Sequence, residues 1–259
     1  MRAPLRLTAL ALLATAACAP AVPRAAGPAT YADGEALIRA MHDRYAGRWY
    51  RTLTFTQTTT RTPPGGQRTV EIWREYGAMP GRLRIEVGPE ADGRGVIYAG
   101  DSTFLVRGGQ VVGRRAARNP LMILGFDVYA QAPETTARIL REEGFALSPV
   151  RLDSWQGRPA YVVGAAAGDL RSKQFWVDAE RLVFVRMIEP SPGDTTKTEE
   201  IRFNDYRPAG GGWIAPEVEV LVDGVLVFHE AYADVRVDVP LDPSLWVPEQ
   251  WTTARKPTP

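Results

Sequence analysis

The stretch Asn119–Tyr129 reads NPLMILGFDVY and is an apolar segment near the middle of the chain. On both sides of it the sequence alternates apolar and polar residues, as half-buried strands do. Within a β-protein such a segment has two possible roles. It is either a plug that completes the core of an open sheet or a movable lid over something that the sheet binds.

The chain before this stretch predicts one helix followed by several strands. Apolar residues recur at helical spacing across Asp33–Trp49, where Asp33 is available as the N-cap. The period then changes to two, and the turn Pro64-Gly65-Gly66 predicts a hairpin. Arg82–Val87 alternates without a break, so one of its faces is expected to be buried and the other to meet water. Further strands are predicted at Gly95–Ala99, Thr103–Arg107 and Gln110–Arg114.

The chain after this stretch predicts a second helix and a second run of hairpins. The helix is expected at Pro133–Glu143, with Gly144 as its C-terminal stop. The later strands are expected at Pro149–Ser154, Arg158–Ala165, Ser172–Val177, Leu182–Ile188, Lys197–Tyr206, Trp213–Val222 and Val225–Val237. A sheet of roughly eleven or twelve strands must curl, and its hollow needs apolar filling.

These elements predict a mainly β fold with a single large curved antiparallel sheet, which is an unclosed β-barrel. The N-terminal helix and the mid-chain helices are expected to fill or cap its concave side, because they are the available filling. We expect this domain to span residues 31–248. A proline-containing flexible tail is expected at 249–259.

The N-terminus has the features of a secretory leader. Two arginines precede the apolar run Leu7–Ala17, which is too short to span a bilayer. Cys18 is the only cysteine, and the TAAC sequence that it ends resembles a bacterial lipobox. We therefore expect a signal peptide at 1–17, lipidation of Cys18 and a tether at 18–30. The alternative is a soluble periplasmic protein cut at an Ala-x-Ala site.

Charge and cysteine content exclude several classes of partner and of covalent structure. The 31 Lys and Arg residues balance 30 Asp and Glu residues, so no nucleic acid or other polyanion is implied as a partner. A single cysteine excludes intramolecular disulfides. Stability must then come from packing. We expect a monomer that needs no cofactor.

Motifs of catalysis and of metal binding do not occur in the sequence. Gly100-Asp101-Ser102 looks like the nucleophile block of GDSL esterases, but these enzymes also need Asp-x-x-His, and Leu226 stands three residues before His229. His42 and His229 have no metal-ligand spacing between them. We therefore predict a protein that is not an enzyme and holds no metal. An enzyme with an unrecognised site is the remaining alternative.

Seven short fragments of the chain share a particular order. They are Leu53–Gln57, Glu71–Trp73, Pro80–Leu83, Val96–Thr103, Asn119–Leu124, Lys173–Asp178 and Asn204–Tyr206. In this order they resemble the strands and the central helix of the LolA/LolB-like family, the periplasmic lipoprotein carriers and receptors whose fold is shared with the sensor RseB. The resemblance covers roughly residues 33–206, and the shared order carries it rather than any single fragment.

The resemblance implies an unclosed, strongly curved sheet that is capped by helices and encloses an apolar cavity for acyl chains. The wall of such a cavity needs paired polar atoms, because a buried unpaired one costs about 1 to 3 kcal/mol. By alternation, the candidates for this wall are Leu53, Phe55, Val70, Ile72, Leu83, Ile85, Val96, Tyr98, Leu121, Met122, Leu124, Phe175 and Val177. Alternation marks a buried face without saying what buries it, so each of them is otherwise plain core.

The resemblance also implies lipid acyl chains or lipoproteins as ligands, with a role in lipoprotein sorting. Ala19 after Cys18 is not the Asp that favours retention at the inner membrane, so we expect the periplasmic side of the outer membrane. The sequence departs from the carrier at Met79, where the family has an arginine that latches the lid. We therefore expect Asn119–Tyr129 to be a plug at rest. The alternative function is an envelope interaction or sensor module with a filled core and no lipid ligand.

Overall fold

The computed structural model describes residues 28–63 and 65–257. The expected signal peptide, the expected lipidation site Cys18 and the tether as far as residue 27 lie outside the described residues. The described part begins six residues before the first helix, α1.

The elements follow the order that the sequence predicted. The helices are α1 (Gly34–Tyr45), α2 (Pro120–Gly125) and α3 (Pro133–Glu142). The strands are β1 (Thr52–Arg61), β2 (Thr69–Ala78), β3 (Arg82–Val87), β4 (Gly95–Ala99), β5 (Ser102–Arg107), β6 (Gln110–Ala116), β7 (Val150–Trp155), β8 (Arg158–Val163), β9 (Gln174–Asp178), β10 (Phe184–Ser191), β11 (Asp194–Asn204), β12 (Arg207–Ala209), β13 (Gly212–Ile214), β14 (Glu217–Val222) and β15 (Val225–Val237). Short 3-10 turns are η1 (Glu90–Asp92), η2 (Asp127–Tyr129), η3 (Pro243–Trp246) and η4 (Pro248–Gln250).

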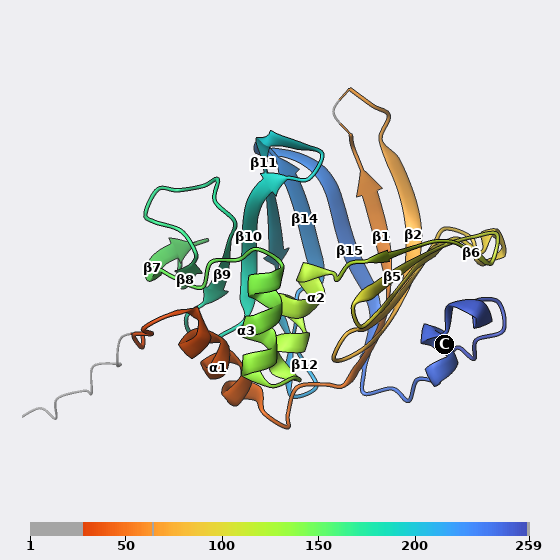
Figure 1. The fold of residues 1–259 in the computed structure, drawn as a ribbon. Coiled ribbons are helices and arrows are strands. Elements are labelled where there is room, and N and C mark those ends of the chain that lie inside the picture. The colour runs from red at the N-terminus through yellow and green to blue at the C-terminus, as the bar shows by residue number, and fades with distance from the viewer. Residues whose placement is uncertain (1–27, 64, 258–259) are drawn as a thin grey trace, which may run out of the picture.

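One antiparallel sheet of 13 strands forms the frame of the molecule. Its order is β6-β5-β4-β3-β2-β1-β15-β14-β11-β10-β9-β8-β7, with β6 and β7 at the two edges. The last long strand, β15, pairs with the first, β1, and so joins the two halves of the chain. The sheet is curved and is not closed (Figure 1), which confirms the predicted fold class.

Helices fill one half of the concave side. In α1 the Asp33 side chain accepts a hydrogen bond from Ala36 N at 2.9 Å, and the helix buries its apolar stripe, including Leu37 and Met41. Figure 1 shows α1, α2 and α3 gathered beside the β8–β14 part of the sheet. The sheet side of this core consists largely of β8–β11 residues.

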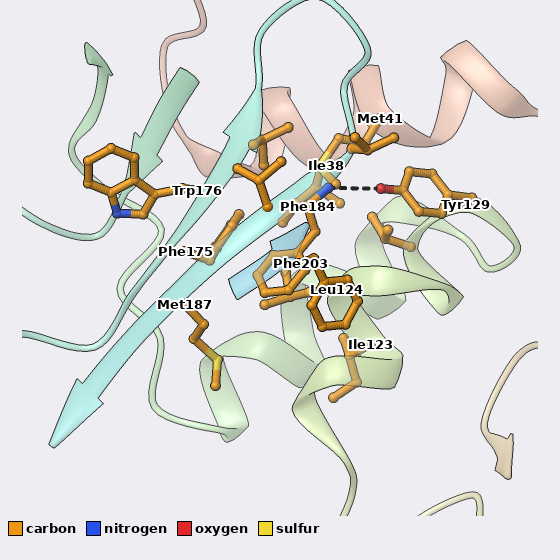
Figure 2. Close-up of a cluster of buried hydrophobic side chains, with 14 of the residues drawn as sticks. Ile38, Met41, Ile123, Leu124, Tyr129, Phe175, Trp176, Phe184, Met187 and Phe203 are labelled. Carbon is orange, nitrogen blue, oxygen red and sulfur yellow. Dashed lines mark hydrogen bonds between the residues drawn. The ribbon is translucent and has the colours of Figure 1, made fainter. Parts of the chain in front are cut away.

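The centre of this core is aromatic. The Tyr129 and Trp49 rings stack with centroids 3.8 Å apart, and the Tyr129 hydroxyl accepts a hydrogen bond from Phe184 N at 3.2 Å. Figure 2 shows this bond among side chains from α1, from the mid-chain helical segment and from the sheet. Phe184 in turn meets Phe203 edge-on at 4.9 Å. The mid-chain stretch is therefore fixed to the sheet by packing and by a hydrogen bond.

A second, smaller core lies on the convex side, behind β2–β5. It consists of Tyr76, Ile97, Val106, Leu245, Trp246 and Trp251. The chain after β15 brings the last three of these residues to the sheet, and the segment lies beside the β2–β6 part (Figure 1). Trp251 is 5% exposed. Mobility of the expected tail, residues 249–259, stays a prediction.

A buried arginine joins this C-terminal segment to the sheet. Arg84 is fully buried, and its Nη2 atom lies 2.7 Å from the Glu86 carboxylate and donates to Trp251 O at 2.7 Å. Its guanidinium also lies 3.9 Å from the centroid of the Trp251 ring. Lys256 approaches the same carboxylate at 3.0 Å. Arg84 and Glu86, which we expected to face water, thus point into the second core.

Candidate functional site

The candidate site is the half of the concave side that lies toward β1–β3. A cavity of about 80 Å³ lies there between α2 and the sheet, and we call it the inner cavity. Most of its lining is apolar. The lining residues are Leu53, Phe55, Glu75, Gly77, Met79, Leu83, Ile85, Asn119, Leu121, Met122, Phe126, Phe203, Val218, Glu230 and Tyr232.

Helix α2 forms the wall opposite the strands. Asn119 caps it by accepting a hydrogen bond from Leu121 N at 3.0 Å, and Pro120 occupies the first turn, where its missing N–H costs no hydrogen bond. The cap directs the first turn, with Leu121 and Met122, toward the inner cavity. Gly125 ends the helix against the sheet, since a Cβ atom there would lie 2.9 Å from the Phe203 ring.

A second hollow continues the apolar face toward the edge strand β6. It measures about 320 Å³, and we call it the outer cavity. Its lining residues are Val96, Tyr98, Thr103, Leu105, Gly113, Arg114 and Arg115. The cross-strand pairs Ile85–Val96 and Leu83–Tyr98 place the floors of the two cavities side by side. The two hollows together exceed the space that a few water molecules would need.

The predicted wall residues fall into three groups. Eight line a cavity: Leu53, Phe55, Leu83, Ile85, Leu121 and Met122 the inner one, and Val96 and Tyr98 the outer one. Leu124, Phe175 and Val177 are fully buried in the filled half instead. Val70 and Ile72 lie on the other side of the sheet, 50% and 49% exposed. Ligand binding by any of the eight stays a prediction.

The position of Val70 and Ile72 corrects our expectation that both line the cavity. Strand β2 pairs with β1 so that Glu75 lies opposite Phe55, whose side chain is on the concave side. Because side chains alternate along a strand, the odd-numbered residues of β2 share that side and the even-numbered ones face outward. The side chains of Val70 and Ile72 therefore lie on the convex surface of the sheet.

The polar end of the inner cavity was not predicted from the sequence. Glu75 is 6% exposed, and its carboxyl has no hydrogen bond or ion pair within the described part of the chain. Glu230 is half-buried and accepts a hydrogen bond from the Tyr232 hydroxyl at 2.9 Å. Gln57 donates to Thr59 at 2.9 Å, but its buried Oε1 atom has no partner. The sequence contained a signal for Glu75, because it lies two residues after Trp73 in the same strand and therefore shares its inward face.

Burial changes the protonation of both carboxyl groups. It raises the pKa of Glu75 well above its usual range, and the nearby Glu230 carboxylate raises it further. Burial also raises the pKa of Glu230 to about 7, although the hydrogen bond from Tyr232 lowers it. At neutral pH the pair therefore carries less negative charge than two exposed glutamates would.

A different contact stands where the family has its latch arginine. Met79 is 8% exposed and forms part of the wall of the inner cavity. Two residues further on, Gly81 N donates to the Asp127 carboxylate of η2 at 3.0 Å. Burial raises the pKa of Asp127 to about 7, and this backbone hydrogen bond lowers it. The mid-chain segment is thus tied to the turn between β2 and β3.

Searches for a metal centre and for a membrane span give nothing within the described residues. No group of three or more His, Cys, Asp or Glu side chains there has the arrangement to hold a metal ion. His42 lies beside Asp43 on α1, whereas His229 lies in β15. None of the helices between residues 28 and 257 has the length and apolar character of a membrane-crossing helix.

Sequence comparison finds no relative of the chain. No protein-family model matches the sequence, and a search of curated proteins gives no match. The fold must therefore be compared through structure.

Structure comparison finds similar solved proteins at low sequence identity. A LolA superfamily protein from Nitrosomonas europaea has 11% identity and a TM-score of 0.49, with 78% of this chain and 94% of that chain covered. A domain assigned as an outer membrane lipoprotein-sorting protein, from Vibrio parahaemolyticus, has 10% identity, a TM-score of 0.53 and coverage of 85% and 96%. A DUF1329 family protein from Desulfovibrio piger has 15% identity, a TM-score of 0.51 and coverage of 82% and 95%. The last two matches show that this chain shares its fold with the lipoprotein-sorting domain and with the DUF1329 protein.

Proposed function

We propose that this protein binds the acyl chains of a lipid or a lipoprotein in the cell envelope, without catalysis. The observation that carries this proposal is the inner cavity, whose wall combines aliphatic side chains from three strands with two from α2. Apolar burial contributes about 25 cal/mol per Å² of surface removed from water, so a flexible chain gains affinity from any such wall that it covers. The outer cavity extends the apolar floor beyond the inner one.

The geometry of the sheet supports a ligand rather than a fully packed interior. The filled half buries its residues under α1 and α3, as Phe175 and Leu140 illustrate, each fully buried. In the other half Ile85, Val96 and Tyr98 are only half-buried, although they point to the same concave side. Half-buried apolar side chains on a concave surface are a common feature of sites for small apolar ligands.

The location that we propose is the periplasmic side of the outer membrane, with an anchor at Cys18. The leader-like residues 1–17 and the TAAC sequence support it. The fold similarity to a lipoprotein-sorting domain from Vibrio parahaemolyticus is consistent with an envelope protein. Lipoprotein sorting is the finer role that we propose for the cavity.

The competing function is an interaction or sensor module of the same fold without a lipid ligand. The filled half favours it, since Leu124, Val128 and Tyr129 are packed against the sheet and leave no space there. In that case the inner cavity would be a packing defect rather than a site. The two functions differ in whether the cavity takes up an acyl chain.

Native mass spectrometry of the full chain, isolated from a bacterial envelope, separates these functions. We expect a lipid-sized mass adduct and uptake of a fluorescent fatty-acyl probe by the delipidated protein. Ligand-free protein that also fails to take up the probe would contradict the binding function. Mass analysis of the mature N-terminus in the same sample tests lipidation of Cys18.

A further inference from the structure

The wall of the inner cavity is apolar except at one end. There β1, β2 and β15 bring Gln57, Glu75 and Glu230 to the concave side of the sheet. Tyr232 marks the border, because its ring stacks on Phe55 at 4.1 Å while its hydroxyl donates to Glu230. The cavity therefore combines an apolar wall with a polar end.

The polar end holds buried polar atoms without hydrogen-bond partners within the described residues. Within the described residues the Glu75 carboxyl takes part in no hydrogen bond or ion pair, and the Oε1 atom of Gln57 has no hydrogen-bond partner, although the two residues are 6% and 1% exposed. The Tyr232 hydroxyl donates to Glu230, and a side-chain hydrogen bond from Gln57 also acts on this carboxyl group. The indole N–H of Trp73 lies on the same face of β2 and lowers the pKa of Glu71, but has no partner within hydrogen-bond distance among the described residues. Buried polar atoms in folded proteins nearly always have a partner, so these unpaired atoms indicate that a polar partner is missing here.

The charged groups at this end are mostly acidic. The titratable or charged groups that act on Glu75 and Glu230 are each other, Tyr98, Tyr232 and Arg61. Arg61 is the cation among them, but its guanidinium lies over the Trp73 and Phe228 rings, 4.9 and 5.5 Å from their centroids. A cation placed between the carboxyl groups would remove their mutual repulsion.

We infer that the inner cavity recognises an amphiphile with a primary ammonium head group, with the head between Glu75 and Glu230 and the alkyl chain along the apolar wall. This inference rests on the proposed acyl-binding function and names the head group that the site selects. An ammonium group supplies three N–H donors and one positive charge. A fatty alcohol supplies one donor and no charge, and a fatty carboxylate brings a further acidic group to a site that already holds two carboxyl groups.

Binding of the ammonium head requires ionised carboxylates. Before binding, burial and the charge of Glu230 raise the pKa of Glu75 and so favour its protonated form. When the cation enters, the O–H bond of a carboxyl group breaks and the proton leaves to the solvent, while the ammonium keeps its own three protons. The site therefore exchanges a proton for the cation, and neutral ligands cause no such exchange.

The test is calorimetric titration of the full chain at pH 7 with decylammonium, decanol and decanoate, each below its micelle concentration. We expect decylammonium to bind at least about tenfold more tightly than decanol, as charge-assisted hydrogen bonds imply. Decanoate is expected to bind most weakly. Titrations in two buffers of different ionisation enthalpy should show proton release with decylammonium and none with decanol.

Matched variants locate the effect. In Glu75→Gln/Glu230→Gln the preference for decylammonium over decanol should fall below about threefold, with decanol binding retained. Glu199→Gln is the control, since burial raises the pKa of this carboxyl too, but it lies on β11 and does not line the cavity.

Equal binding of all three probes, or a preference that survives the double variant, would overturn the ammonium site and leave acyl binding intact. Binding of none of the three would overturn both. The two-buffer titration needs no variant, so it stands even if the double variant fails to fold.

Discussion

The Asp127 carboxylate and the backbone N–H of Gly81 form a hydrogen bond with 3.0 Å between Oδ1 and N. This bond joins the mid-chain segment, in the turn after α2, to the turn between β2 and β3. Its donor is a backbone group, and its acceptor is a carboxyl group that is 4% exposed. The mid-chain segment is therefore held at the rim of the inner cavity by a contact whose strength depends on protonation.

Asp127→Asn should flatten the pH dependence of stability. Burial raises the pKa of Asp127 from 3.8 to about 7 in the folded chain, so the folded state binds more protons than the unfolded state between these values. Stability from this group is complete below about pH 4 and is lost as the pH rises through 7. We expect the wild type to lose about 2 to 4 kcal/mol more free energy of unfolding than the variant between pH 4 and pH 8. Urea titrations at both pH values measure the difference, and parallel losses in the two proteins would contradict it.

Ile85→Asn should weaken binding of a fatty-acyl probe. Ile85 lines the inner cavity, and a carboxamide there places unpaired polar atoms against the alkyl chain, at about 1 to 3 kcal/mol. We expect the dissociation constant of the probe to rise about fivefold or more. Ile72→Asn is the matched control, because Ile72 is 49% exposed on the convex side. If both variants bind as the wild type does, the acyl chain lies elsewhere.

Two leucines of the same helix should respond differently to truncation. Leu124→Ala removes a fully buried side chain from the filled half and is expected to lower the free energy of unfolding by about 2 to 5 kcal/mol. Leu121 is half-buried beside the inner cavity, so Leu121→Ala should cost less than about 2 kcal/mol and change probe affinity instead. Chemical denaturation and probe titration of each variant separate the two roles. Equal loss of stability in both variants would mean that Leu121 is core.

Arg84→Ala should release the C-terminal segment from the sheet. The variant leaves Glu86 buried at 3% exposure with Lys256 and Arg74 as its remaining close cations, and removes both carbonyl contacts to the segment. We expect a loss of about 2 to 4 kcal/mol and earlier proteolytic cleavage after residue 240. Arg94→Ala is the control, because the side chains of the Arg94–Glu71 ion pair are 43% and 26% exposed, and the pair should be worth less than about 1 kcal/mol. Unchanged cleavage in Arg84→Ala would show that the segment is held by its tryptophans alone.

The sequence predicted the strands well because each alternates over several residues between clear turns. Arg82–Val87 is an example, since its range is as expected, although Arg84 and Glu86 on its polar face are buried and do not meet water. Alternation separates the two faces of a strand, but it does not tell which face lies on the concave side of the sheet. The pairing of Phe55 with Glu75 settles this for β2, and it depends on the register between strands. For the same reason Glu75 was missed, and Val70 and Ile72 were placed in the cavity.

The mid-chain stretch shows why plug and lid could not be separated from sequence. Its apolar residues look alike in the sequence, but Leu124 and Tyr129 are buried in the filled half while Leu121 and Met122 line the inner cavity. Which residue faces which half follows from the cap at Asn119 and from contacts with strands far along the chain, such as Tyr129 with Phe184. Local pattern carries no information about such long-range contacts.

The convex core has a consequence for how the binding wall can vary. Strands β3–β5 are anchored from behind, by Trp246, Trp251 and Arg84, and not by the side chains that face the cavities. The packing that holds the wall in place thus lies on the convex side of the sheet, opposite the cavities. Residues such as Ile85, Val96 and Tyr98 can therefore be substituted to fit another ligand while the packing behind the strands is kept. The same packing holds these strands in place when no ligand is bound.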